Sequence, residues 1–324
     1  MESNARNERQ AMLKRGGIVL AVVVVLLLVL NLITGGRFAT SSNLIAIVSN
    51  SVFTAFVVLG MCFIFTMGIT DLSIGAVVVL ASNVGGILAL NAGMGYLGML
   101  VGAIAVAVAC MMLNVTLIRK AEIPAWILGL GMVMVYEAIG AIYNNGQIAQ
   151  GKQSVSLNNS FRALGAPPWN IIILVLCVAA AYFIYNRTSI GFNLRAVGSN
   201  EAVAKLMGVN INKAVMLAVL VGGCFIGIGS AIDISYAGRI TPSTGLNSIA
   251  MVFNPLAAYL LAQALSGIFN ITIAAPIGAF IITAVFNVLT IIGVPSGTWQ
   301  QVMLGAVVLI CGMLSRRNYK GVVK

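Results

Sequence analysis

Long runs of apolar residues alternate along this chain with short polar connections. A helix that crosses a bilayer needs about 20 predominantly apolar residues, and ten stretches of the sequence meet that requirement. They cover residues 17–34, 46–68, 72–91, 95–118, 123–143, 169–186, 213–236, 245–267, 269–292 and 298–315. The pattern therefore predicts an all-α polytopic membrane protein of about ten transmembrane helices.

Two of these stretches contain residues that interrupt the apolar pattern. Asn83 lies inside the third, and Asn254 followed by Pro255 lies inside the eighth. Irregular backbone at membrane depth is tolerated only where protein surrounds it or where it lines a water-filled cavity. We therefore expect the third and eighth stretches to be candidates for broken or re-entrant segments.

The positive charges orient the helices, because cytoplasmic loops carry an excess of Lys and Arg. With the N-terminus inside, ten crossings place 14 of the 18 Lys and Arg residues in the cytoplasm. The other four lie outside: Arg37, Lys152, Arg162 and Arg239. A wrong number of crossings would scramble this asymmetry, so the charges support ten spans with both termini in the cytoplasm.

The division of the chain follows from this topology. Residues 1–16 are a basic cytoplasmic tail, and the apolar run after them is too long for a signal peptide core, so we interpret it as a retained first helix. Residues 17–315 form a single transmembrane domain, with a longer inner loop at about 187–212. Residues 316–324 form a second cytoplasmic tail.

Composition excludes several other classes of protein. Only 8% of the residues are charged and 60% are hydrophobic, whereas soluble domains carry about 25% charged residues. The net charge of +11 is dispersed between apolar runs, so it does not form the clustered basic face that binds nucleic acid. The chain has no His, and its five Cys residues stand singly in apolar stretches. We expect no metal site, no cofactor and no catalytic residue.

The inner loop contains a short predicted helix. Ser199 or Asn200 can cap its start. Glu201 suits the positive end of the helix and can pair with Lys205 four residues later. Gly208 suits a left-handed stop. The pattern predicts a helix of about two turns between residues 200 and 208.

This short helix carries an apolar stripe formed by Val203, Leu206 and Met207. Such a stripe is small enough to enter a groove on another protein. It would equally suit a helix that lies on the membrane surface. The residues alone leave both interpretations open.

The same segment resembles the coupling-helix region of the permease subunits of ribose-type ABC sugar importers, which has the pattern E-A-A-x-x-x-G. Glu201 and Ala202 match its start, Val203 replaces the second alanine, and Gly208 supplies the glycine. The resemblance implies that Asn200, Lys205, Leu206, Met207 and their neighbours bind a cytoplasmic ATPase subunit.

The resemblance extends over about residues 40 to 315. Residues 68–75, G-I-T-D-L-S-I-G, are similar to the family's G-G-I-D-L-S-V-G stretch. We expect Asp71 at the inner membrane edge, where its carboxylate stays hydrated. Asp71 or Ser73 would cap the next helix; the alternatives are an ATPase contact and a gate hinge. Residues 259–267 lack the family's glycine-rich pattern, and Glu137 replaces its usual arginine.

Polar residues within the spans are candidates for a substrate pathway. Four are amides that serve equally well as hydrogen-bond partners between helices: Asn50, Asn83, Asn254 and Gln263. Glu137 differs, because a carboxylate at membrane depth is costly and marks a functional site by default. It would line the mouth of the pathway or pair with a cation of the outer loops, for which Arg239, Arg162 and Lys152 are available.

The sequence contains no P-loop motif, so energy must come from another subunit or from an ion gradient. The resemblance implies a permease subunit of an ABC importer in a bacterial cytoplasmic membrane. Two copies would form the pathway for a monosaccharide, with two ATPases and an extracytoplasmic binding protein. Alternatives are a nucleoside or branched-chain amino acid as substrate, and an ion-coupled secondary transporter. The latter should show paired halves with discontinuous helices, and the sequence shows no convincing halves.

Overall fold

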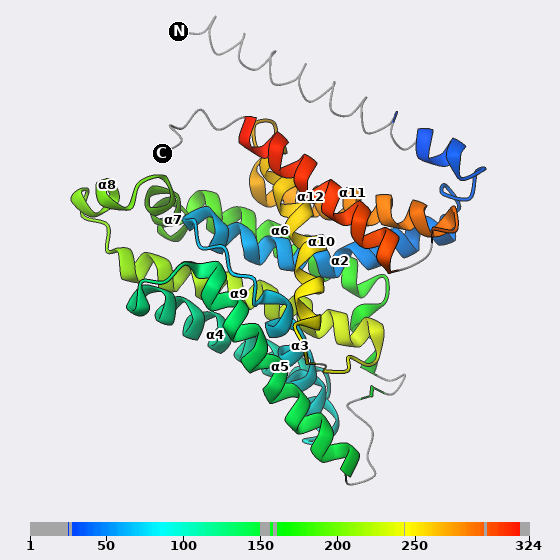
Figure 1. The fold of residues 1–324 in the computed structure, drawn as a ribbon, viewed down its shortest axis with the longest axis horizontal. Coiled ribbons are helices and arrows are strands. Elements are labelled where there is room, and N and C mark those ends of the chain that lie inside the picture. The colour runs from blue at the N-terminus through cyan, green and yellow to red at the C-terminus, as the bar shows by residue number, and fades with distance from the viewer. Residues whose placement is uncertain are drawn as a thin grey trace, which may run out of the picture.

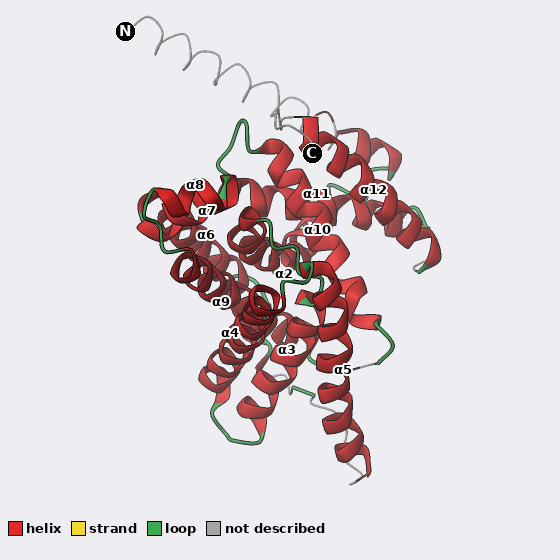
Figure 2. Ribbon diagram, turned by 60° about the vertical axis from the view of Figure 1, so that its left-hand side comes forward, coloured by secondary structure: helices red, strands yellow, loops and turns green. Residues whose placement is uncertain are grey.

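The computed structural model describes residues 25, 28–149, 156–157, 161–242, 244–294 and 297–317. Figures 1 and 2 show helices joined by loops. The longer helices are α2 (Ser41–Ile64), α3 (Ile74–Leu90), α4 (Gly95–Ala121), α5 (Ala125–Ala149), α6 (Trp169–Arg187), α9 (Ile211–Ala237), α10 (Ala250–Leu265), α11 (Ile271–Ile291) and α12 (Thr298–Arg317). The shorter ones are η1 (Phe65–Met67), η3 (Ala163–Gly165), α7 (Ser189–Ser199), α8 (Glu201–Leu206) and η4 (Asn247–Ile249).

The helices confirm the prediction of an all-α polytopic membrane protein. Within the described residues, seven helices are long and apolar enough to cross a membrane, and α3 and the central part of α12 are shorter apolar helices. These nine correspond to the second to tenth predicted spans. The first predicted span, 17–34, lies mostly outside the described residues.

The expected interruptions are misplaced. Asn83 lies within a continuous α3, and α10 runs through Pro255 without a break. The irregular backbone instead precedes each helix, at residues 68–73 and, among the described residues, at 238–242 and 244–246. With 17 residues, α3 is only about 25 Å long, shorter than the ~30 Å hydrocarbon core. α10 together with η4 covers 19 residues, Asn247–Leu265. Asn83 is buried among neighbouring helices, whereas Asn254 is exposed.

The helices are arranged as two corresponding halves. In Figure 1, α2 and α9 run through the middle, with α4 and α5 below them and α11 and α12 above. α4 packs on α9 in one half, and α11 packs on α2 in the other. Likewise, α3 lies against α4 and α5, and α10 lies against α11 and α12. The set α2–α5 thus corresponds to α9–α12. The sequence analysis missed these halves, because two sets of helices can pack alike without similar sequences when most of their residues are apolar.

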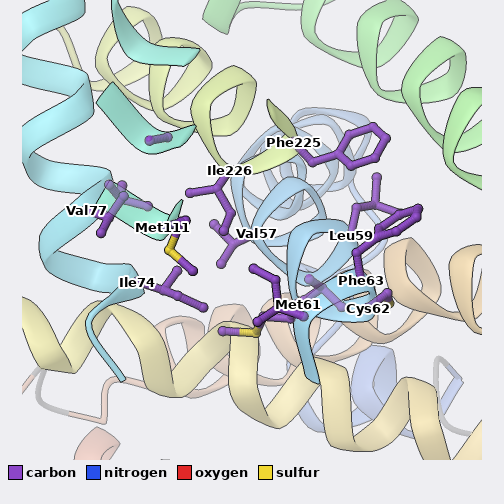
Figure 3. Close-up of a cluster of buried hydrophobic side chains, with 14 of the residues drawn as sticks. Val57, Leu59, Met61, Cys62, Phe63, Ile74, Val77, Met111, Phe225 and Ile226 are labelled. Atoms are coloured by element: carbon purple, nitrogen blue, oxygen red, sulfur yellow. The ribbon is translucent and has the colours of Figure 1, made fainter. Parts of the chain in front are cut away.

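The central pair is closely packed through glycines. A Cβ at Gly60 of α2 would lie 2.5 Å from Ile226 and 2.8 Å from the carbonyl oxygen of Gly222, both on α9. Small residues let the backbones of membrane helices approach in this way. Around this contact, Figure 3 shows Val57, Met61 and Ile226 among the buried side chains of the core.

The topology gives the first prediction. Ala92, in the turn between α3 and α4, and Lys205, in α8, are both exposed. We expect an impermeant thiol reagent to label Ala92→Cys from outside the membrane and Lys205→Cys only from inside, in a parent chain without native cysteines. Labelling of both positions from one face would contradict the ten-span orientation.

Candidate functional site

The helices enclose a cavity of about 460 Å³, here called the outer cavity. It is lined by the first and middle turns of α2, the last turns of α9, the start of α10 and the second half of α11. The predicted orientation places all four of these helix portions toward the outside. In the predicted orientation, the cavity lies within the outer half of the bundle.

Polar and aromatic side chains share the wall of the outer cavity. The polar ones are Ser49, Asn50, Thr54, Asp233, Asn254 and Thr283, and the aromatic ones are Phe53, Tyr236 and Phe286. A mainly apolar pocket with a few converging polar groups is typical of a small-molecule site. Its volume also falls within the ~300–1,000 Å³ usual for such sites.

A second cavity of about 550 Å³, the inner cavity, lies near the other ends of the same helices. Its polar wall includes Thr66, Tyr185, Arg195, Gln263, Ser266 and Asn270. These residues lie just beyond the end of α2, at the ends of α6 and α10, in α7, and before the start of α11. The predicted orientation places all of them toward the cytoplasm.

The two cavities are stacked along α2 and separated by packed side chains. From Thr54 in the outer cavity to Phe65 in the inner one, α2 advances about 17 Å. Leu59 and Phe63, between them, are completely buried. α10 and α11 also meet closely at this level, since a Cβ at Gly278 would lie 2.5 Å from the carbonyl oxygen of Ala258. The bundle is therefore closed between the cavities.

The structure divides the amides that the sequence grouped together. Asn50 and Asn254 both line the outer cavity, whereas Gln263 lines the inner cavity. Asn83 is in neither wall, and its Nδ2 donates to the carbonyl oxygen of Val79 one turn earlier in α3. A place in a pathway for Asn83 has no support from this geometry and stays a prediction.

Asp233 is the lining residue that the sequence analysis missed. It lies near the end of α9 in the run A-I-D-I-S-Y-A, and its side chain faces the outer cavity. The signal was present, because a carboxylate within a predicted span is a functional candidate by default. The same argument that selected Glu137 should have selected Asp233.

Glu137 lies outside both cavity walls and joins three elements. Its Oε2 accepts a hydrogen bond from the backbone N–H of Leu246 (2.9 Å). Its Oε1 accepts from the backbone N–H (2.7 Å) and the hydroxyl (2.6 Å) of Ser248. The backbone of Ser248 in turn leaves no room for a Cβ at Gly75 of α3. The carboxylate thus ties α5 to the start of α10, which packs on the start of α3.

This arrangement bears on the two hypotheses for Glu137, a pair with a cation of the outer loops and a place at the mouth of the pathway. Both carboxylate oxygens are satisfied by donors at a helix N-terminus, where negative charge is favoured, so a cation is not required to hold it. Lys152, one of the proposed cations, lies outside the described residues. A role for Glu137 at the mouth of a pathway remains a prediction.

Asp71 is buried, which corrects the expectation that it stays hydrated at the membrane edge. It has no exposed surface, and its Oδ2 accepts from Asn114 Nδ2 at 2.8 Å. Asn114 lies seven residues before the inner end of α4, or about 10 Å along the axis. Asn114 also donates to Ser73 Oγ and accepts from the hydroxyl of Tyr136. This network links α3, α4 and α5.

Asp71 or Ser73 was expected to cap α3, and the hydrogen bonds of the structure differ from a simple side-chain cap. The side chain of Ser73, the residue before α3, makes no capping hydrogen bond to the helix. Asp71 Oδ1 accepts instead from the backbone N–H of Ser73 at 2.8 Å. The carboxylate therefore orders the turn that leads into α3. An ATPase contact or a gate hinge at Asp71 remains a prediction, and full burial does not favour the contact.

α8 has the form expected of the short inner helix. Asn200 caps it, with its Oδ1 accepting from the N–H of Val203 at 3.1 Å. Gly208 ends it with a φ of 84°. Glu201 pairs with Arg119 at the end of α4, at 3.0 Å, and the expected partner Lys205 is not used. This pair fastens α8 to the bundle.

The apolar stripe of α8 points away from the bundle. Leu206 is 87% exposed and Met207 79% exposed. Counted along the chain, Gly208 stands one position further from Glu201 than the E-A-A-x-x-x-G pattern requires. The assignment of α8 as a docking helix therefore depends on this exposed stripe more than on the motif.

Comparison with known proteins places the chain among permeases. Residues 43–312 match the family model described as "Branched-chain amino acid transport system / permease component". The fructose import permease of Rhizobium meliloti is 26% identical over 235 residues, 70% of this chain and 65% of that protein. The ribose import permease of Escherichia coli K12 is 26% identical over 289 residues, 86% of each chain.

The xylose transport permease of Haemophilus influenzae is 27% identical over 168 residues, 52% of this chain and 43% of that protein. No solved structure matches the chain. The family description names amino acids and these relatives are named for sugars, so membership does not by itself select the substrate. The chain belongs to the permease-component family of branched-chain amino acid type transport systems, as a transmembrane subunit and not as an enzyme.

Proposed function

We propose that this chain is the membrane-spanning subunit of an ABC importer that brings a monosaccharide across the cytoplasmic (inner) membrane of a bacterium. The observation that carries the proposal is the stack of two cavities along α2, separated by packed side chains, one toward each predicted face. A transporter that opens to one side at a time needs this arrangement. The exposed stripe of α8 lies on the side of the inner cavity.

The proposed partners are those of an importer of this family, and the geometry supports the site of one of them. An ATPase subunit would receive the apolar stripe of α8, and its movement would reach the bundle through the Glu201–Arg119 pair and through α7, which packs on α6 and α9. An extracytoplasmic binding protein would deliver the solute to the outer cavity. A second copy of the chain would complete the pathway. The relatives named for fructose, ribose and xylose import support a monosaccharide.

Uptake by the reconstituted complex tests this function. The chain would be assembled in liposomes with its ATPase inside and its binding protein outside, and supplied with labelled D-ribose, D-fructose or D-xylose. We expect accumulation of one of these sugars that requires internal ATP and the binding protein. Orthovanadate should abolish it, and a protonophore should leave it unchanged.

An ion-coupled secondary transporter is the competing function. Many such transporters are built from two structural repeats, and the fold has two corresponding halves that the sequence did not reveal. The same assay separates the two functions. Uptake that survives without ATP and disappears with the protonophore would contradict the ABC proposal. Family membership supports the ATP-driven function. Because the chain itself has no P-loop, ATP would be hydrolysed on a separate subunit.

A further inference from the structure

The wall of the outer cavity carries one acidic group and no basic one. Asp233 is the carboxylate, and no Lys or Arg lies among the described lining residues. Arg162 approaches from the outer loop, where its Nη2 donates to the backbone carbonyl of Tyr236 at 2.6 Å. Its guanidinium is not part of the wall, and neither is that of Arg239. Asp233 is therefore the one source of negative charge in the described wall, and no cation of that wall balances it when it is ionised.

Two polar groups of this wall have capacity left for a ligand. No described residue donates a hydrogen bond to the carboxylate of Asp233. The hydroxyl oxygen of Ser49 is buried without a hydrogen-bond partner. Buried polar atoms in native structures are nearly always paired. Ser49 Oγ is such an unpaired buried atom, and the carboxylate of Asp233, which is partly exposed, lines the same cavity without a donor. Together they point to a ligand that supplies their partners.

The chemistry of these groups selects the ligand. An ionised carboxylate only accepts hydrogen bonds, and it accepts them strongly from hydroxyl groups. Asn50 and Asn254 both donate and accept, which suits the other hydroxyls of a polyol. Phe53 and Phe286 add apolar surface for carbon-bound hydrogens. A neutral sugar can satisfy all of these groups at once.

Charged solutes fit poorly. A phosphorylated or carboxylated sugar would bring its negative charge beside Asp233 with no cation in the wall to balance it. A branched-chain amino acid could place its ammonium group on Asp233, but its own carboxylate would remain unpaired, which is costly away from water. Unpaired charge of this kind is a common device for rejecting the wrong ligand.

We infer that the outer cavity is a binding site for uncharged polyhydroxylated solutes, in which Asp233 accepts solute hydroxyls and repels anions. The inference rests on the proposed function and names the class of substrate. It makes Asp233 a specificity-determining residue of the membrane subunit itself, in addition to any selection by a binding protein.

The charge of the cavity can be measured without knowing the solute. Thr283 lines the outer cavity from α11, and Thr290, two turns further along the same helix, is exposed outside it. Cysteine would be placed at each in turn, as Thr283→Cys and Thr290→Cys, in the assembled transporter in nanodiscs. The labelling rate of each cysteine would be measured with a cationic and with an anionic methanethiosulfonate reagent. The labelling rate of the parent chain would be subtracted, and each rate would be divided by that reagent's rate with free mercaptoethanol, which removes the difference in intrinsic reactivity.

At Thr283→Cys, we expect the cationic reagent to be favoured by about tenfold over the anionic one, because a nearby carboxylate attracts one and repels the other. Adding Asp233→Asn should remove most of this preference. Thr290→Cys should show little preference with either residue at position 233. Thermal unfolding would verify that every variant is folded.

Protection by solutes completes the test. D-ribose, D-fructose or D-xylose should slow the labelling of Thr283→Cys, while D-ribose 5-phosphate and L-leucine should not. If Asp233→Asn leaves both the charge preference and the protection unchanged, the inference is wrong although the importer function stands. If L-leucine protects and no sugar does, both the inferred ligand class and the proposed monosaccharide substrate are wrong.

Discussion

Replacing Leu206 by Asp is expected to abolish the stimulation of ATP hydrolysis by the binding protein while leaving the chain folded and inserted. Leu206 is 87% exposed at the end of α8, so the substitution removes no packing within the chain. On the docked partner, however, it would carry a charge into an apolar groove. Central apolar contacts of this kind contribute about 2 kcal/mol or more, which is roughly a 30-fold loss of docking.

The matched control is Leu206→Met, which keeps an apolar side chain of similar volume and should retain stimulation. The measurement is ATP hydrolysis by the purified complex with and without binding protein, together with co-purification of the ATPase. Normal stimulation in the Leu206→Asp variant would mean that α8 lies on the membrane surface and does not couple the subunits.

The spans could be predicted because each of them is a local property of the sequence. About 20 apolar residues suffice to define a transmembrane helix, and nine predicted spans correspond to helices of the structure. The start of α3 could not be placed in the same way. Residues 68–73 follow η1 as irregular backbone. The burial of Asp71 and its contact with Asn114, both properties of the folded chain, show that they enter the bundle.

The partners of the buried carboxylates also lie beyond sequence reasoning. Glu137 and Ser248 are 111 residues apart along the chain, and nothing in either local pattern indicates the contact. The hydration of Asp71 was predicted wrongly because its depth was inferred from the span boundary. α8 was predicted well, since a capping residue, an apolar stripe and a terminal glycine all act within one short segment.

Substitution of Glu137 should destabilise the protein more than any other change considered for its polar residues. Glu137 is 4% exposed, and its carboxylate accepts from two backbone N–H groups and one hydroxyl. In Glu137→Ala both N–H groups lose their acceptor, at about 1–3 kcal/mol each, and a void is left. We expect a loss of about 3–5 kcal/mol in the free energy of unfolding.

Glu137→Gln is the sharper variant because it keeps the volume. Its NH₂ group must replace one carboxylate oxygen, so a donor then faces the N–H of Leu246 or of Ser248. The expected cost is about 1–3 kcal/mol. The same substitution at Glu122, which is exposed at the end of α4, is the matched control and should change stability by less than about 0.5 kcal/mol.

The consequence for transport follows from the position of Ser248. It immediately precedes α10, whose first turns bring Met251 and Asn254 to the outer cavity. Loosening the Glu137 contact should therefore lower uptake and thermal stability together. The readouts are the unfolding midpoint of the purified complex and the rate of sugar uptake. Slower uptake at unchanged stability would instead assign Glu137 to the mouth of the pathway, and wild-type values for both would leave it neither role.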